Sequence, residues 1–116
     1  GGGLWETRVE HASVMSSLMQ LAPEMFSGLV HPLAKLLTDP CYVVRRHGGE
    51  KALVMFDRWA KHDAIFTFIA KSLLLRPAPE AGATDQELET RVLTLAGVAL
   101  HSPALEPRVM FMVCAH

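Results

Sequence analysis

A chain of 116 residues has the size of one domain, which excludes a cofactor domain joined to a separate substrate domain. Half of its residues are hydrophobic and its mean hydropathy is +0.22, so the composition excludes intrinsic disorder. Eleven basic and twelve acidic residues give a formal charge of −1, unlike the strong positive charge of a dedicated nucleic-acid binder.

The cysteine content and the apolar stretches favour a protein that is neither secreted nor inserted in a membrane. Its two cysteines, Cys41 and Cys114, are too few for the disulfide framework of a small secreted module. The longest apolar stretch, residues 64–75, is interrupted by Lys71 and is too short to cross a bilayer. These features predict an intracellular protein, in the cytoplasm or nucleus, that has no membrane partner. The glycines at residues 1–3 are expected to form a flexible leader.

The spacing of apolar residues predicts an all-α fold of about six helices. Apolar positions recur every three or four residues, and nowhere do they alternate with polar ones long enough to form a half-buried strand. The stripe through Trp5, Ala12, Met15 and Met19 predicts a first helix over residues 4–21.

Prolines mark the next two helices. The second helix is expected to begin at Pro23 and to kink near Gly28, because Pro32 removes a backbone donor inside it. Asp39 is expected to cap the third helix, with Pro40 in the first helical position.

The middle of the third helix carries small residues. Gly48 and Ala52 lie one turn apart on a seam that continues through Met55 and Trp59. Glycine and alanine let a neighbouring helix approach closely. The seam therefore predicts a helix that is packed on both sides.

Cap residues and prolines predict the last three helices. Asp63 caps a fourth helix, which ends by Arg76 because Pro77 disfavours helical geometry before it. After a loop over the next residues, Thr84 opens a capping box for a fifth helix with a strong apolar stripe. A last apolar helix follows Pro107.

The turn before the third helix resembles that of a known repeat. Asp39, Pro40, Val44 and Arg45 match by position the D-P-x-x-x-V-R turn of the HEAT repeat, a pair of helices that stacks into α-solenoids. In that family the Asp and Arg positions are associated with contacts between successive repeats. The resemblance therefore implies structural roles for these four turn residues, and it leaves an armadillo-type variant open.

The resemblance also implies a domain organisation. We expect one repeat domain over residues 4–116, a right-handed stack with helix pairs at about 23–60 and 84–116. Such pairs cannot bury their apolar faces alone, so neighbouring pairs stack. Because the last segment stays apolar without a stop signal, we expect a fragment of a longer array. Its terminal faces would be covered by further repeats of the parent chain, by a second copy, or by the first helix.

No residue pattern points to catalysis, a cofactor or a metal. The six histidines lack the paired i, i+4 spacing and the partner carboxylates of zinc sites. The stretch 48–51 lacks the spacing of a phosphate-binding loop. A ligand pocket would need converging polar residues that the sequence does not reveal. The sequence therefore predicts a non-enzymatic scaffold that binds another protein through its helical surface.

Basic residues gather in the stretch 44–61, which holds five of them against two acidic residues. Within it, Arg46, Arg58, Trp59 and Lys61 are the candidates for partner contact, because Trp and Arg are frequent hot spots and Arg pairs with carboxylates through two hydrogen bonds. Three alternatives remain open: an ordinary solvated helix face, a core role for Trp59, and a nucleic-acid-associated repeat that uses the basic stretch.

Overall fold

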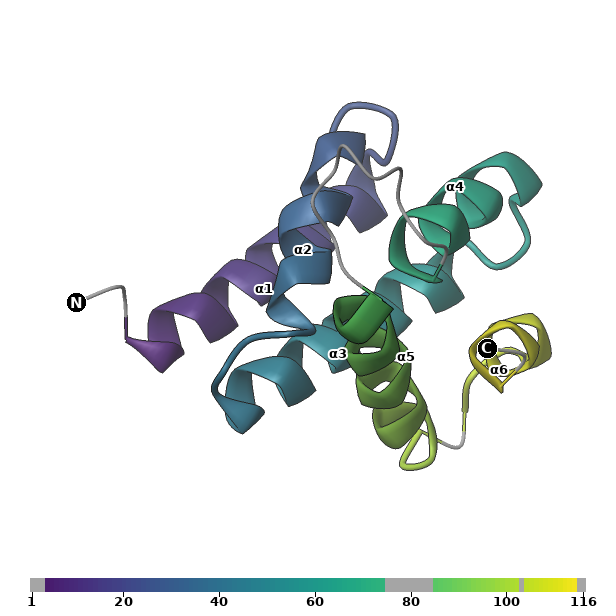
Figure 1. Cartoon of the computed structure of the whole chain (residues 1–116). Helices are drawn as coiled ribbons and strands as arrows, with labels where there is room; N and C mark the ends of the chain where they lie inside the picture. Colours follow the sequence, from purple (N-terminus) through teal and green to yellow (C-terminus); the bar gives the residue numbers. More distant parts are fainter. Residues whose placement is uncertain (1–3, 75–84, 103, 115–116) are drawn as a thin grey trace.

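The computed structural model describes residues 4–74, 85–102 and 104–114, and these residues form six α-helices and one short 3₁₀ helix without any strand (Figure 1). The predicted all-α fold with six helices is therefore confirmed. The expected leader at residues 1–3 and the expected loop at 77–83 lie outside the described residues.

The helices follow the predicted order along the chain. Their bounds are α1 (Trp5–Leu21), η1 (Ser27–Leu29), α2 (Val30–Leu36), α3 (Tyr42–Arg58), α4 (Asp63–Leu74), α5 (Asp85–Ala99) and α6 (Pro107–Cys114).

Helices that are next but one along the chain pack side by side: α1, α3 and α5 form one row, and α2 and α4 form a second row. Helix α3 packs against α1 on one side and α5 on the other, while α2 packs against α4 (Figure 1). Each helix also contacts the next one along the chain, and α6 contacts both α5 and α3. Helix α3 therefore touches each of the other five α-helices, which makes it the centre of the fold.

The second helix differs from its prediction. Residues 23–26 form turns and a bend, η1 follows, and α2 begins only at Val30. Pro32 is thus the third residue of α2, in the first turn, where backbone N–H groups have no partner within the helix. The expected helix from Pro23 with a kink near Gly28 was wrong, because the chain breaks before Val30 and the proline interrupts no hydrogen bond.

Two expected helix starts are displaced. Helix α3 begins at Tyr42 with Cys41 as its N-cap, so Pro40 precedes the helix instead of occupying its first position. Asp39 accepts a hydrogen bond from the Cys41 N–H at 2.9 Å and so closes the turn before the helix. Asp63 is the first residue of α4 and not the residue before it.

The last helices begin near their predicted positions. Helix α5 begins at Asp85 and α6 begins at Pro107. The expected end of the fourth helix at Arg76 and the expected cap at Thr84 lie outside the described residues.

Two glycines allow helices to approach α3 from different sides. A Cβ atom on Gly48 would lie 3.2 Å from Leu36 Cβ in α2, and one on Gly49 would lie 3.0 Å from Val98 Cγ2 in α5. Both distances are shorter than an ordinary van der Waals contact. The prediction that α3 is packed on both sides is therefore confirmed.

A third face of α3 is covered by α1. The buried residues of α1 are Ala12, Ser16 and Met19, and the Ser16 hydroxyl donates a hydrogen bond to the Lys51 carbonyl at 2.8 Å. Trp5, expected on the buried stripe, is exposed. The buried face of α1 therefore carries Ala12, Ser16 and Met19 and excludes Trp5.

Arg108 holds α6 against the turn between α3 and α4. Its Nη1 donates to the Ala60 carbonyl at 3.1 Å and to the Asp63 carboxylate. Its guanidinium carbon lies 4.1 Å from the centre of the Phe66 ring. One side chain thus joins α6 to the turn after α3 and to α4.

Candidate functional site

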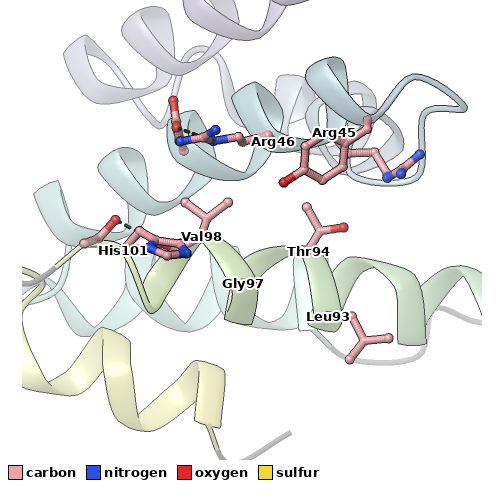
Figure 2. A pocket seen from close by; sticks show the side chains of 10 residues that line it. Arg45, Arg46, Leu93, Thr94, Gly97, Val98 and His101 are labelled. Atoms are coloured by element: carbon pink, nitrogen blue, oxygen red, sulfur yellow. Dashed lines mark hydrogen bonds and ion pairs between the residues drawn. The ribbon is translucent and has the colours of Figure 1, made fainter.

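A groove of about 510 Å³ lies between α3 and α5 (Figure 2). One wall comes from the first half of α3 and the other from the second half of α5 and the turn that follows it. The residues that decide its character are Arg45, Arg46, Glu50, Leu93, Gly97 and His101. The groove is therefore lined by both charged and apolar groups.

The glycines of the two helices explain why a groove opens here. At Gly49 the missing side chain lets α5 lie against α3, and the Thr94 hydroxyl fixes this contact by donating to the Leu37 carbonyl at 3.1 Å. At Gly97 a Cβ atom would meet no atom of another helix within 4 Å. The helices are in contact at Gly49, and the space above Gly97 stays open.

Arg46 lies on the α3 wall of the groove, across from Val98 and His101 on the α5 wall (Figure 2). Its Nε is 3.4 Å from Glu50 Oε1, and its side chain is 58% exposed. A guanidinium has five N–H donors, so the pair with Glu50 occupies only part of its capacity. Exposed pairs of this kind contribute about 0 to 1 kcal/mol, which leaves Arg46 available to an incoming anion.

Arg45 is engaged with its own turn. Its Nη1 donates to the Asp39 carbonyl at 2.7 Å and to the Pro40 carbonyl at 3.1 Å. Its guanidinium also lies 5.7 Å from the centre of the Tyr42 ring. Arg45 therefore adds positive charge at the end of the groove while its hydrogen bonds close the turn.

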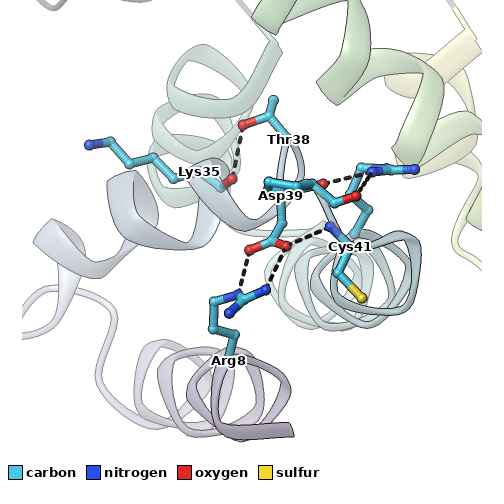
Figure 3. Close-up of polar contacts among 7 residues, drawn as sticks. Arg8, Lys35, Thr38, Asp39 and Cys41 are labelled. Atoms are coloured by element: carbon cyan, nitrogen blue, oxygen red, sulfur yellow. Dashed lines mark hydrogen bonds and ion pairs between the residues drawn. The ribbon is translucent and has the colours of Figure 1, made fainter. Parts of the chain in front are cut away.

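The turn is tied to α1 by an ion pair between Arg8 and Asp39 (Figure 3). Arg8 Nε lies 2.7 Å from Asp39 Oδ2, and Arg8 Nη2 lies 3.2 Å from Oδ1. Val44, the remaining residue of the repeat-like turn, is fully buried. The four turn residues thus lie together, with Arg8 as a partner from another helix.

Burial raises the pKa of Asp39, but other interactions outweigh it. Hydrogen bonds from Arg8 and from the Cys41 N–H, with the positive charges of Arg8 and Arg45, hold the pKa of the carboxyl below its ordinary value. The hydrogen bond to Asp39 in turn raises the pKa of Arg8. Both groups are therefore charged in the folded protein at neutral pH.

Arg8 did not emerge from the sequence as a site residue. The available signal was positional, because Arg8 is the fourth residue of α1 just as Arg45 is the fourth residue of α3. That correspondence becomes informative only when α1 is known to lie beside α3.

The other candidates for partner contact lie at the far end of α3. Arg46 and Arg58 are separated by about 18 Å along the helix and by about 120° around it, from helix geometry. The guanidinium of Arg58 lies 5.5 Å from the centre of the Trp59 ring, and Lys61 is exposed in the following turn. The structure therefore does not bring the four candidates into one surface.

Trp59 has a contact within the protein. Its Nε1–H donates to the Met19 carbonyl at 3.2 Å, and its ring meets the His62 ring edge-on at 4.9 Å between centres. Because this bond satisfies a carbonyl in the last turn of α1, Trp59 joins the ends of α1 and α3.

A further arginine lies in the interior. Arg91 in α5 is 7% exposed, and its Nε has no hydrogen-bond partner among the described residues. Burial lowers the pKa of its guanidinium, while the charge of Glu87 opposes this shift. The spacing places Arg91 between Leu88 and Leu95 on the apolar stripe of α5, so its burial follows from its position on that stripe.

The described residues were also compared with the requirements of a metal site and of a membrane-spanning helix. Within them, no three His, Cys, Asp or Glu side chains lie close enough together to hold a metal ion. None of their helices is both long enough and apolar enough to cross a bilayer.

Comparison with known proteins gives one informative similarity. The chain is 28% identical over 125 aligned residues to a serine/threonine-protein kinase ATM from Arabidopsis thaliana. The alignment covers 96% of this chain and 3% of that protein, so the chain spans a very small part of its relative. No family model matches the chain, and no solved structure matches it.

Proposed function

We propose that this chain is a non-enzymatic helical scaffold segment that binds a partner protein through the α3–α5 groove. The observation that carries the proposal is the open groove floor at Gly97, with Arg46 and His101 on opposite walls. A groove of this size falls within the range of about 300 to 1,000 Å³ that is typical of ligand sites, so it can hold a few side chains of a partner.

The proposal places the chain within a larger helical protein. The similarity to 3% of a much longer relative supports this context, although it carries no information on phosphoryl transfer by this chain. Val14 and Leu21, seven residues apart on one face of α1, are 56% and 81% exposed. Further repeats of the parent chain, packed against this face, would remove these side chains from water.

Nucleic-acid binding through residues 44–61 is the alternative. It would need several cations along one path, because affinity for nucleic acid scales with the number of neutralised phosphates. The separation of Arg46 from Arg58 and Lys61 disfavours such a path. This alternative is therefore kept as an outcome of the test.

Photo-cross-linking tests the proposal. A benzophenone amino acid replaces Leu93, which is 64% exposed in the groove, or Met25, which is 77% exposed in the turn after α1, as the control. We expect a discrete protein adduct from position 93 in cell extract that persists in high salt and is lost with Arg46→Glu. The same adduct from both positions, or a nuclease-sensitive adduct lost in high salt, would contradict the proposal.

A further inference from the structure

We propose that the α3–α5 groove recognises an acidic peptide segment, with a carboxylate at Arg46 and an adjacent apolar side chain over Gly97. This inference rests on the proposed function and specifies the chemistry of the partner. It follows from the charges on the groove walls, the composition of the floor, and the charges beyond its end.

Basic residues outnumber acidic ones on the groove walls. Arg45 and Arg46 lie on the α3 wall with a single carboxylate, that of Glu50, and the His101 ring lies on the α5 wall, across from Arg46 (Figure 2). Arginine binds a carboxylate through two parallel hydrogen bonds, which lysine cannot do. A carboxylate that enters between Arg46 and His101 therefore finds charge-assisted donors from the arginine and a ring nitrogen on the other side.

The floor beside this charge is apolar. Leu93 and Val98 border the open space at Gly97, where a Cβ atom would meet no atom of another helix within 4 Å. An apolar side chain of a partner, placed here, is removed from water without displacing any group of the protein. The groove thus favours an acidic residue next to an apolar one.

The negative charge beyond Leu93 favours a peptide over a nucleic acid as the occupant of the groove. Leu93 also borders a second hollow, of about 410 Å³, which is lined by Asp85 and Glu89. A phosphate backbone that continues along α5 in this direction would meet like charges, which disfavour it. A peptide avoids this repulsion, because its charge is confined to particular side chains.

Selection from random libraries tests the inference without a known ligand. The full chain is immobilised and challenged with a displayed library of random peptides and, in parallel, with a pool of random single-stranded oligonucleotides. We expect enrichment of peptides that carry Asp or Glu next to Leu, Ile or Phe. Their affinity should fall at least about tenfold with Gly97→Trp, which fills the floor, and with Arg46→Glu.

Matched variants control for general effects of these changes. Gly28→Trp adds the same ring at another glycine whose Cβ position is open, and Arg58→Glu reverses a charge at the far end of α3. Both should leave the affinity within twofold, and thermal melting should show that all four variants fold.

The other outcomes separate two kinds of failure. Enriched peptides of different chemistry that Gly97→Trp still weakens would overturn the acidic specificity but retain the groove as a protein-binding site. Peptides indifferent to Gly97→Trp, enrichment of oligonucleotides alone, or no enrichment at all would overturn both the inference and the proposed function.

Discussion

Asp39 joins three segments of the chain through one carboxylate and one carbonyl. The carboxylate accepts from Arg8 of α1 and from the N–H of Cys41, and the carbonyl accepts from Arg45 of α3. Its low pKa means that the folded protein binds a proton at Asp39 less readily than the unfolded chain does. The stabilisation is therefore present above the ordinary carboxyl pKa and is lost as the pH falls through the lower, folded-state pKa.

We expect Asp39→Asn to lower the free energy of unfolding by about 1 to 3 kcal/mol at pH 7, because the charged partner of Arg8 is lost. Urea unfolding at pH 7 and at successively lower pH measures this. The unfolding free energy of the parent protein should decline below about pH 4, and the variant should decline less over the same range. Glu10→Gln, at an exposed position of α1, is the control; equal acid sensitivity in Asp39→Asn and the parent would contradict the assignment.

The tryptophan at the end of α3 gives a second test. Trp59→Phe keeps an aromatic ring but removes the donor to the Met19 carbonyl. We expect a loss of about 1 kcal/mol in the free energy of unfolding, the typical net contribution of one hydrogen bond. Trp5→Phe, at an exposed tryptophan, should change it by less than half as much. Equal losses in the two variants, measured by urea unfolding, would show that the Nε1 bond contributes nothing.

Helix types and order could be predicted from the sequence, because apolar spacing and cap residues are local signals. The start of α2 could not: Phe26 and Leu29 fit a helical stripe, yet the chain forms turns and a 3₁₀ turn there before Val30. The α3–α5 groove could not be predicted from the sequence either. Arg46 was a candidate, but Gly97 and His101 join it only through the packing of α5 on α3.

Alanine substitutions can test the contrast between close packing at Gly48 of α3 and open space at Gly97 of α5. In Gly48→Ala the new Cβ would lie 3.2 Å from Leu36 Cβ, an atom attached directly to the backbone of the residue at the end of α2, so the two helices must separate. We expect this strain, about 1 to 3 kcal/mol, to exceed the gain in helix propensity. Gly97→Ala has open space and should stabilise the protein by up to about 1 kcal/mol. Thermal melting that ranks Gly48→Ala above Gly97→Ala would contradict the packing.

Across the whole molecule, the contacts converge on α3 and thin out toward α6. Helix α3 touches each of the other α-helices, whereas α6 contacts α5 and α3. Hydrogen bonds add to the few contacts of α6. The Glu106 N–H donates to Asp57 Oδ1 at 2.7 Å, and Arg108 binds the turn after α3. Because local opening is easiest where few buried contacts must break, α6 should open without the rest of the fold.

Hydrogen exchange measures this gradient of stability. We expect the amides of α3 to exchange only through global unfolding and those of α6 to exchange through a local opening of lower free energy. Arg108→Gln removes the charge over the Phe66 ring and weakens the bonds to Ala60 and Asp63. Exchange in α6 should then accelerate by about tenfold, equivalent to about 1.4 kcal/mol, while α1 is unchanged. Arg58→Gln, on the exposed surface of α3, should alter neither helix. If Arg108→Gln accelerated exchange equally in α1 and α6, the fold would open as one unit, and α6 would be as integral to it as the central helix.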